Sequence, residues 1–100
     1  MRIIALKKLR ESWENDPALL PARDPVLAWY RHTLQADWQN PAEVKRDFGS
    51  ASLLRDNRVV FNIGGNNFRL VVRINYSYRV VYIRFLGTHQ QYDQQDVESV

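Results

Sequence analysis

A change in hydrophobic periodicity near residue 58 is the feature that most constrains the fold of this chain of 100 residues. Before it, apolar residues recur at intervals of three and four, the spacing of one face of a helix. After it, polar and apolar residues alternate, which is the spacing of a strand with one buried face. Because each element must bury its apolar side against another, we predict one α+β domain over residues 1–100, with N-terminal helices packed on an antiparallel sheet.

Three helices are expected in the first half of the chain. The first covers residues 5–15 and ends before the Asp-Pro pair that follows, because the residue preceding a proline disfavours the helical conformation. The second begins at Asp24 as N-cap, with Pro25 in its first turn. A third, short helix follows Asn40, and Glu43 is placed to close a capping box. The apolar stripes expected to face the sheet are Leu6, Leu9 and Trp13 in the first helix and Leu27, Tyr30, Leu34 and Trp38 in the second.

The second half of the chain predicts strands at Arg58–Ile63, 67–75 and 79–86. Gly64 and Gly65 tolerate positive φ, which favours a tight hairpin between the first two strands. Residues 2–4 could add a short edge strand, and residues 49–57 are expected to form a loop. The prediction is therefore a sheet of three to four strands, followed by a short C-terminal helical turn.

Alternation within the last two strands sorts their side chains onto two faces. The apolar face is expected to hold Phe68, Leu70, Val72 and Ile74 together with Val81, Ile83 and Phe85. The opposite face is expected to hold Arg69, Val71 and Arg73 together with Val80, Tyr82, Arg84 and Leu86. Docking of the apolar face on the helices leaves arginines and a tyrosine on a rigid platform. Guanidinium groups bind phosphate in a bidentate manner, and a tyrosine ring offers a base a surface on which to stack.

Positive charge is concentrated in the same part of the chain, although the net charge is only +3. Residues 44–84 contain eight basic side chains against two acidic ones, Asp47 and Asp56. The eight are Lys45, Arg46, Arg55, Arg58, Arg69, Arg73, Arg79 and Arg84. This segregation favours a polyanionic partner, and an ordinary solvated surface is the alternative.

A short polar segment, Gly87-Thr88-His89-Gln90-Gln91-Tyr92-Asp93, follows the last strand. If Thr88 caps a turn of helix, His89, Tyr92 and Asp93 lie three and four residues apart and project from one side. Histidine is the side chain best suited to proton transfer near neutral pH. A solitary histidine is more often a plain surface residue, so the weight of His89 comes from the arginine face beside it.

These residue types meet the needs of RNA cleavage by attack of a 2′-hydroxyl on the adjacent phosphate. That reaction requires a proton acceptor, a proton donor and cations around the crowded phosphate. Arginine cannot be the base, because it does not lose its proton in proteins. His89 is therefore the candidate acid or base with Tyr92 as its helper, and Asp93 either orients His89 or caps the local backbone. The expected catalytic residues are His89, Tyr92, Arg69 and Arg84, and the expected RNA contacts are Arg73, Tyr82, Arg58 and Asp93.

Composition disfavours several other classes of protein. Without cysteine there can be no disulfide framework or thiolate metal site. His32 is expected to be a surface residue, and neither it nor His89 has the spaced ligands of a zinc site, so no metal or other cofactor is expected. Lys7 and Lys8 fall where a signal peptide needs its apolar stretch, and no apolar run approaches the ~20 residues that span a bilayer. We therefore expect a cytoplasmic protein.

Three segments resemble the HigB-type toxins of type II toxin–antitoxin systems, which belong to the RelE-like mRNA interferases. They are Val60-Phe61-Asn62-Ile63-Gly64-Gly65-Asn66-Asn67-Phe68-Arg69-Leu70, Val81-Tyr82-Ile83-Arg84 and Thr88-His89-Gln90-Gln91-Tyr92-Asp93. The similarity is close over residues 58–93 and looser around Leu9 and Trp13. It implies a RelE-like fold, ribosome-dependent cleavage of messenger RNA, and neutralisation by a HigA-like helix-turn-helix antitoxin. It also implies a toxin that is monomeric when free and hetero-oligomeric with its antitoxin.

Carried over by position, the resemblance implies working roles for Arg69, Arg73, Arg84, His89 and Tyr92, the residues that alternation selects. RelE-type toxins differ in their catalytic sets and some use lysines in the sheet, whereas this chain has no lysine after Lys45. The division of labour between acid and base is therefore left open. Two rival interpretations remain. One is a non-catalytic RNA-binding module, which would not need His89 or Tyr92, and the other is an interaction domain whose basic face docks an acidic protein.

Overall fold

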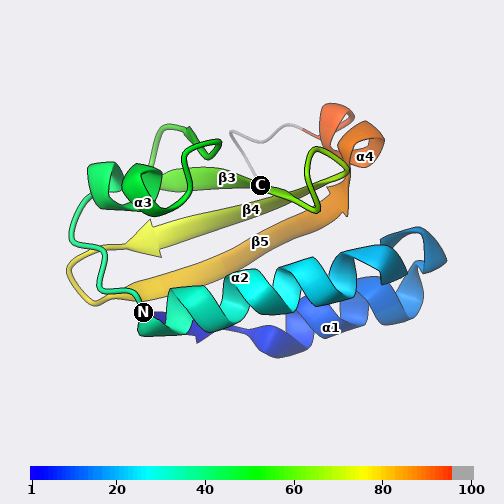
Figure 1. Cartoon of the computed structure of the whole chain (residues 1–100), viewed down its shortest axis with the longest axis horizontal. Helices are drawn as coiled ribbons and strands as arrows, with labels where there is room; N and C mark the ends of the chain where they lie inside the picture. The colour runs from blue at the N-terminus through cyan, green and yellow to red at the C-terminus, as the bar shows by residue number, and fades with distance from the viewer. Residues whose placement is uncertain (96–100) are drawn as a thin grey trace.

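A computed structural model describes residues 1–95 of the chain, in which helices pack against a mixed β-sheet (Figure 1). The helices are α1 (Leu6–Asn15), the 3-10 helix η1 (Pro17–Ala22), α2 (Arg23–Gln35), α3 (Pro41–Asp47) and α4 (His89–Asp93). The strands are β1 (Arg2–Ile4), β2 (Ser52–Leu53), β3 (Arg58–Ile63), β4 (Phe68–Asn75) and β5 (Val80–Thr88). The α+β class predicted from the change in periodicity is confirmed.

Within residues 1–95 the sheet has five strands in the order β1-β5-β4-β3-β2. The strands β2 to β5 pair antiparallel, and β1 runs parallel to β5 with Ile3 beside Val81. The prediction of three to four strands is therefore at least one strand too few, because the segment 49–57, predicted as a loop, contains β2. Its two residues pair with Val60 and Val59. A strand this short shows no alternation in the sequence.

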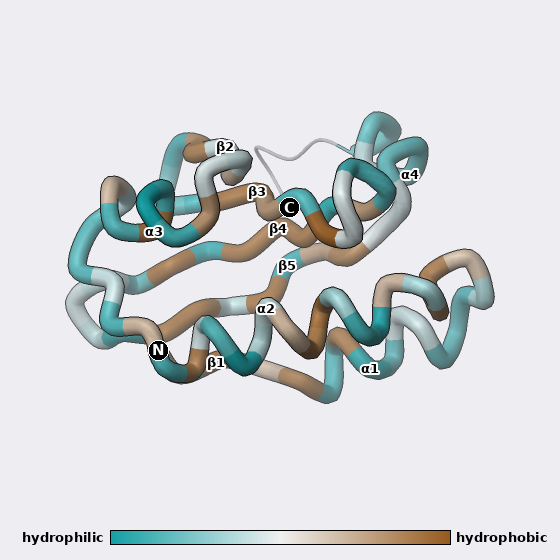
Figure 2. The backbone as a smooth tube through the Cα atoms, in the orientation of Figure 1, coloured by the Kyte–Doolittle hydropathy of each residue, from teal (hydrophilic) through white to brown (hydrophobic). Residues whose placement is uncertain are grey.

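One face of the sheet forms the hydrophobic core with the helices. Buried core residues from the helical half include Leu9, Trp13, Val26, Trp29, Trp38 and Val44, and those from the sheet include Val59, Phe61, Leu70, Val72, Ile74 and Val81. The ring of Phe61 lies at the centre, with ring centroids 5.3 Å from Trp29 and 5.1 Å from Phe48. Figure 2 shows apolar stretches along the strands. This core fixes which face of the sheet is left for binding.

The start of α2 differs from the prediction. The helix continues directly from η1, so Arg23 is its first residue and Asp24 lies in its first turn instead of capping it. The residues of α2 that are fully buried are Val26, Trp29 and Thr33. The most buried positions of α2 therefore lie one residue before the predicted ones: Leu27 and Tyr30 are only partly buried against the core, and Leu34 is exposed. Trp38 is buried as predicted, but it lies beyond the end of α2 at Gln35. The phase of α2 is set by η1, whose Leu19 and Ala22 are already buried when the helix begins.

The other predicted boundaries agree closely with the structure. Helix α1 ends at Asn15, and Asn40 caps α3 by accepting a hydrogen bond from the Glu43 backbone N–H at 3.1 Å. The Glu43 carboxylate accepts from Gln39 N at 2.6 Å, so the return contact of the expected capping box falls one residue earlier. Gly64 and Gly65 have φ angles of 61° and 70° in the predicted hairpin. Such angles cost glycine little, which explains the pair at this turn.

Candidate nucleic-acid interface

The sheet face opposite the core is organised as rows of cross-strand neighbours, and we call it the basic face. Its three rows are Arg58, Arg73 and Tyr82, then Val60, Val71 and Phe85, and then Asn62, Arg69 and Gly87. Val60 and Val71 are buried, but they lie outside the main core cluster. Two polar rows therefore flank one apolar row, and the prediction that Arg69, Val71 and Arg73 share a face is confirmed.

A β-bulge at Arg84 changes the predicted alternation in β5. Val72 pairs with Ile83 and Val71 pairs with Phe85, which leaves Arg84 without a ladder partner. A bulge inserts one residue into one strand, so the side chains beyond it change faces. Leu86 consequently joins the core, and Phe85 turns to the basic face. The prediction that placed Phe85 in the core and Leu86 on the opposite face is therefore wrong.

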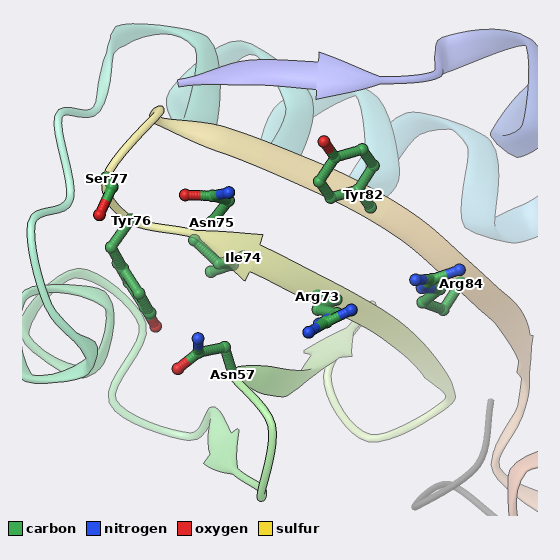
Figure 3. Close-up of a pocket in the computed structure, with 8 residues that line it drawn as sticks. All are labelled: Asn57, Arg73, Ile74, Asn75, Tyr76, Ser77, Tyr82 and Arg84. Atoms are coloured by element: carbon green, nitrogen blue, oxygen red, sulfur yellow. The ribbon is translucent and has the colours of Figure 1, made fainter.

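A cavity of about 510 Å³ opens on the basic face (Figure 3). Its walls are formed by Asn57, Arg73, Ile74, Asn75, Tyr76, Ser77, Tyr82 and Arg84. In Figure 3 the side chains of Arg73, Arg84 and Tyr82 stand on β4 and β5, with α2 behind the sheet. The structure thus brings together two of the predicted phosphate-binding arginines and the predicted stacking tyrosine.

Backbone hydrogen bonding positions one of the two arginines. Arg73 Nε donates to the carbonyl oxygen of Asp56 at 3.2 Å. That carbonyl belongs to a turn in which Asp56 and Asn57 have φ angles of 57° and 61°. Arg84 is exposed on the bulge of β5 and also lines the cavity. Guanidinium groups form strong, charge-assisted hydrogen bonds with phosphate oxygens, so an anionic linkage is a fitting occupant.

The other two arginines singled out from the sequence lie outside the cavity walls. Arg58 is opposite Arg73 in the ladder, but its side chain is only 13% exposed and its Nη1 lies 3.4 Å from Asp56 Oδ2. Arg69 Nη1 donates to the carbonyl oxygens of Asn66 at 2.9 Å and Phe68 at 3.2 Å. Arg69 therefore braces the β3–β4 hairpin.

Helix α4 holds the predicted titratable residues at the end of β5. Thr88 caps it as predicted: its Oγ1 accepts from Gln91 N at 3.1 Å, and Gln91 Oε1 accepts from Thr88 N at 2.9 Å. His89 Nδ1 lies 3.0 Å from Asp93 Oδ2, and both side chains are more than half exposed. None of His89, Tyr92 and Asp93 is among the described residues that line the cavity. Of the predicted site residues, the cavity walls therefore contain Arg73, Arg84 and Tyr82 and none from α4.

Sequence reasoning missed the polar wall of the cavity, formed by Asn57, Asn75, Tyr76 and Ser77. Asn57 lies in the turn before β3, Asn75 is the last residue of β4, and Tyr76 and Ser77 lie in the turn that follows, so strand alternation gives little signal for this wall. The Tyr76 hydroxyl is buried without a hydrogen-bond partner among residues 1–95. Burial raises the pKa of Tyr76, so its phenol stays protonated near neutral pH.

A second polar cluster lies between α2 and α3. Asp47 Oδ2 accepts a hydrogen bond from Trp38 Nε1 at 2.9 Å and lies 3.2 Å from His32 Nε2. The hydrogen bond from Trp38, followed by the contact with His32, holds the pKa of Asp47 below its ordinary value. His32, predicted as a surface residue, is half exposed and helps to tie α3 to α2.

Residues 1–95 contain no group of three or more His, Cys, Asp or Glu side chains that could hold a metal ion. None of the helices in this part of the chain has the length and apolar character required to cross a membrane.

Residues 22–95 match the HigB toxin family, described as the RelE-like toxic component of a toxin–antitoxin system. The chain belongs to the HigB toxin family. The matched residues contain the whole cavity wall and α4, so the family match covers the features built above. The resemblance seen in the three sequence segments is confirmed, and membership of this family implies an antitoxin as partner.

Curated relatives of this HigB-family chain are named for an activity on RNA. The mRNA interferase toxin HigB of Escherichia coli (strain K12) is 28% identical over 95 residues, which cover 93% of this chain and 88% of the relative. The mRNA interferase HigB of Shigella flexneri gives the same values. The mRNA interferase HigB of Escherichia coli O6:H1 is 27% identical over 67 residues, 65% of each chain.

Proposed function

We propose that this protein is an endoribonuclease toxin that cleaves messenger RNA on the ribosome. The observation that carries the proposal is the cavity on the basic face, where Arg73, Arg84 and Tyr82 stand together (Figure 3). Two cations and an aromatic ring suit one phosphate and one base of single-stranded RNA. The names of the relatives, all mRNA interferases, support the same reading.

In the proposed reaction the 2′-hydroxyl of one nucleotide attacks the adjacent phosphorus, and the bond to the 5′-oxygen of the next nucleotide breaks. Arg73 and Arg84 stabilise the charge that develops on the phosphate oxygens. No bound metal is required by this scheme, because guanidinium groups supply the positive charge.

The attacking 2′-hydroxyl gives up a proton and the departing 5′-oxygen takes one up, and His89 is assigned to this proton transfer as acid or base. Its Nδ1 is occupied by Asp93, which leaves Nε2 for the RNA. Arg84 is the cavity residue nearest to α4 along β5, so an RNA strand that lies along β5 passes from Tyr82 over Arg84 towards His89. Tyr92, on the same short helix, is proposed as a helper in proton transfer.

Dependence on the ribosome follows from the small number of catalytic groups. Arginine cannot remove a proton, and His89 lies outside the cavity walls. The free protein is therefore expected to bind RNA without aligning the 2′-hydroxyl, the phosphate and His89 for reaction. A ribosome that fixes the message for in-line attack would supply the missing orientation. We propose further that the protein acts in the cytoplasm and that its partner is a HigA-like helix-turn-helix antitoxin.

The test is cleavage of a defined message in purified ribosomes programmed with that message. We expect a cut that leaves a 2′,3′-cyclic phosphate end, and no cut when a 2′-deoxynucleotide replaces the one at that position. The His89→Ala protein should bind the message but leave it intact. A wild-type protein that cuts neither bound nor free message, and that does not arrest growth when expressed, would refute the proposal.

A non-catalytic RNA-binding module is the second candidate, favoured by the position of His89 and Tyr92 outside the cavity walls. It predicts that wild-type protein and His89→Ala bind RNA equally and that neither cuts it. The same ribosome experiment therefore decides between the two.

A further inference from the structure

We propose that Phe85 is a second base-stacking surface, so that the basic face holds two adjacent bases of single-stranded RNA. One base lies on Tyr82, the next lies on Phe85, and the phosphate between them is bound at Arg84. This inference rests on the proposed function, since it specifies how the same site engages its RNA.

The bulge at Arg84 is what puts the two rings on one side of the sheet. Residues 82 and 85 of a regular strand would point to opposite faces, because side chains alternate. Here Tyr82 pairs with Arg73 and Phe85 pairs with Val71, and those two partners are two residues apart on β4. The core cluster contains Val72 and Ile83 but neither Val71 nor Phe85, which places Phe85 with Tyr82 on the basic face.

The absence of a side chain at Gly87 leaves room for the Phe85 ring. A Cβ atom built on Gly87 would lie 2.4 Å from Phe85 Cζ and 2.8 Å from Phe85 Cε2, so the ring covers the position where any other residue would carry a side chain. The ring is partly exposed, in contrast to the buried Val60 and Val71 of the same row. A partly exposed aromatic ring on the basic face offers a flat surface on which a base can stack.

The spacing of Tyr82 and Phe85 along β5 fits bases that are splayed apart. Each strand residue advances about 3.3 Å, so residues 82 and 85 are separated by roughly 7–10 Å, allowing for the bulge. Bases stacked on each other along a duplex strand are separated by about 3.4 Å. Two neighbouring bases must therefore unstack to reach Tyr82 and Phe85, as they do on the aromatic platforms of other RNA-binding sheets. Arg84 lies on the bulge between Tyr82 and Phe85 in the sequence and has no partner in the β4–β5 ladder, so its side chain is proposed to bind the phosphate that links the two bases.

The experiment measures binding of a short RNA to the full chain by fluorescence anisotropy. The RNA carries 2′-O-methyl groups to prevent cleavage, and abasic sites replace one base at a time. Loss of either of two adjacent bases should weaken binding to wild-type protein by roughly 5- to 100-fold, the range for one base–aromatic stack. The Phe85→Leu protein should bind the intact RNA more weakly by a similar factor. Its affinity should no longer change when one of the two bases is replaced by an abasic site. Tyr82→Leu should become insensitive to the other position.

Controls separate stacking from folding. Phe85→Tyr keeps the ring and should bind as wild type does, and Tyr78→Leu removes a ring that is 79% exposed outside the cavity wall and should also be silent. If thermal unfolding shows that Phe85→Leu is not folded, Phe85→Met takes its place.

The outcomes also separate this inference from the proposed function. Folded Phe85→Leu that binds RNA as tightly as wild type overturns the second stacking surface. So does a Phe85→Leu protein that responds to the same abasic positions as wild type. In either case Arg73, Arg84 and Tyr82 can still bind RNA. Failure of the wild-type protein to bind or cleave any RNA would instead remove the proposed function itself.

Discussion

His89 and Asp93 face each other one helical turn apart on α4, with Nδ1 of the imidazole 3.0 Å from Oδ2 of the carboxylate. A carboxylate in this position fixes the ring orientation and keeps the proton on Nδ1, so Nε2 is the nitrogen that meets a ligand. The pair exists because Thr88 caps α4 and Gln91 closes the capping box. Gln91 Nε2 also donates to Asp16 Oδ2 at 2.9 Å, which anchors α4 to the start of η1.

We predict that His89→Ala lowers the rate of message cleavage by about 10²- to 10⁴-fold, the usual contribution of a general acid or base. Asp93→Asn should cause a smaller loss, because the imidazole remains but is no longer oriented by a charged partner. Rates are measured with programmed ribosomes at saturating protein. Gln90→Ala, a change at an exposed position on the same helix, is the matched control and should be silent. Undiminished cleavage by His89→Ala would remove His89 from the reaction.

Replacement of Arg73 or Arg84 by alanine should weaken RNA binding and reduce its dependence on salt. Each arginine that contacts a phosphate contributes about one unit to the slope of log affinity against log salt concentration, and slightly less for single strands. Binding is measured between about 50 and 200 mM salt, because the affinity of proteins that contact phosphates changes strongly over this range. Arg31→Ala, an exposed position on α2 behind the sheet, should leave the slope unchanged. Equal slopes for all three variants would show that the cavity arginines do not contact phosphate.

Gly87→Ala should destabilise the protein by about 1–3 kcal/mol, the usual cost of forcing an extra group into a packed position. The added methyl group would overlap Phe85, whose Cζ lies 2.4 Å from the Cβ position. Gly49→Ala is the matched control, because no atom lies within 4 Å of the Cβ position there. Urea unfolding of the two variants gives the comparison. Similar stabilities would mean that the Phe85 ring moves aside freely.

The unfolding free energy should depend on Asp47 at acidic pH. The pKa of Asp47 is lowered in the folded protein from an ordinary value of 3.8, so its ionised form stabilises the fold. That contribution is complete above pH 3.8 and is lost as the pH falls through the lower, folded-state pKa. Asp47→Asn should therefore show a shallower loss of stability below pH 3.8 than the wild-type protein.

Urea unfolding between pH 2.5 and 6 would measure this acid dependence. Glu11→Gln is the control, since Glu11 is an exposed carboxylate whose nearest cation, Lys7 Nζ, is 3.8 Å away. The control should keep the wild-type pH dependence. The same pH dependence in Asp47→Asn would show that another group controls acid unfolding.

The sheet meander and its basic face could be predicted because local sequence rules decide them. The bounds of β3 are as predicted, and the positive φ angles of Gly64 and Gly65 are those that the hairpin requires. Alternation alone places Arg73 and Tyr82 on the face away from the helices. These features depend on residues that are neighbours in the chain.

The bulge at Arg84 could not be predicted, because the segment 80–86 is compatible with two registers. Phe85 and Leu86 are both apolar, so either can fill the core, and the choice depends on pairing with β4. The phase of α2 depends in the same way on η1, and the polar cavity wall depends on turns brought together by the sheet. These features arise from contacts between segments far apart in sequence.

Within residues 1–95, the parallel pairing of β1 with β5 joins the first strand to the last, with Arg2 beside Val80. During synthesis Arg2 cannot pair with Val80 until residue 80 has emerged from the ribosome. The cavity arginines lie on β4 and β5, which are also synthesised after helices α1 to α3. A partly made chain therefore lacks both a closed sheet edge and an assembled binding surface. Activity of the kind proposed would therefore arise only after the segment that forms β5 has been made and has paired with β1 and β4.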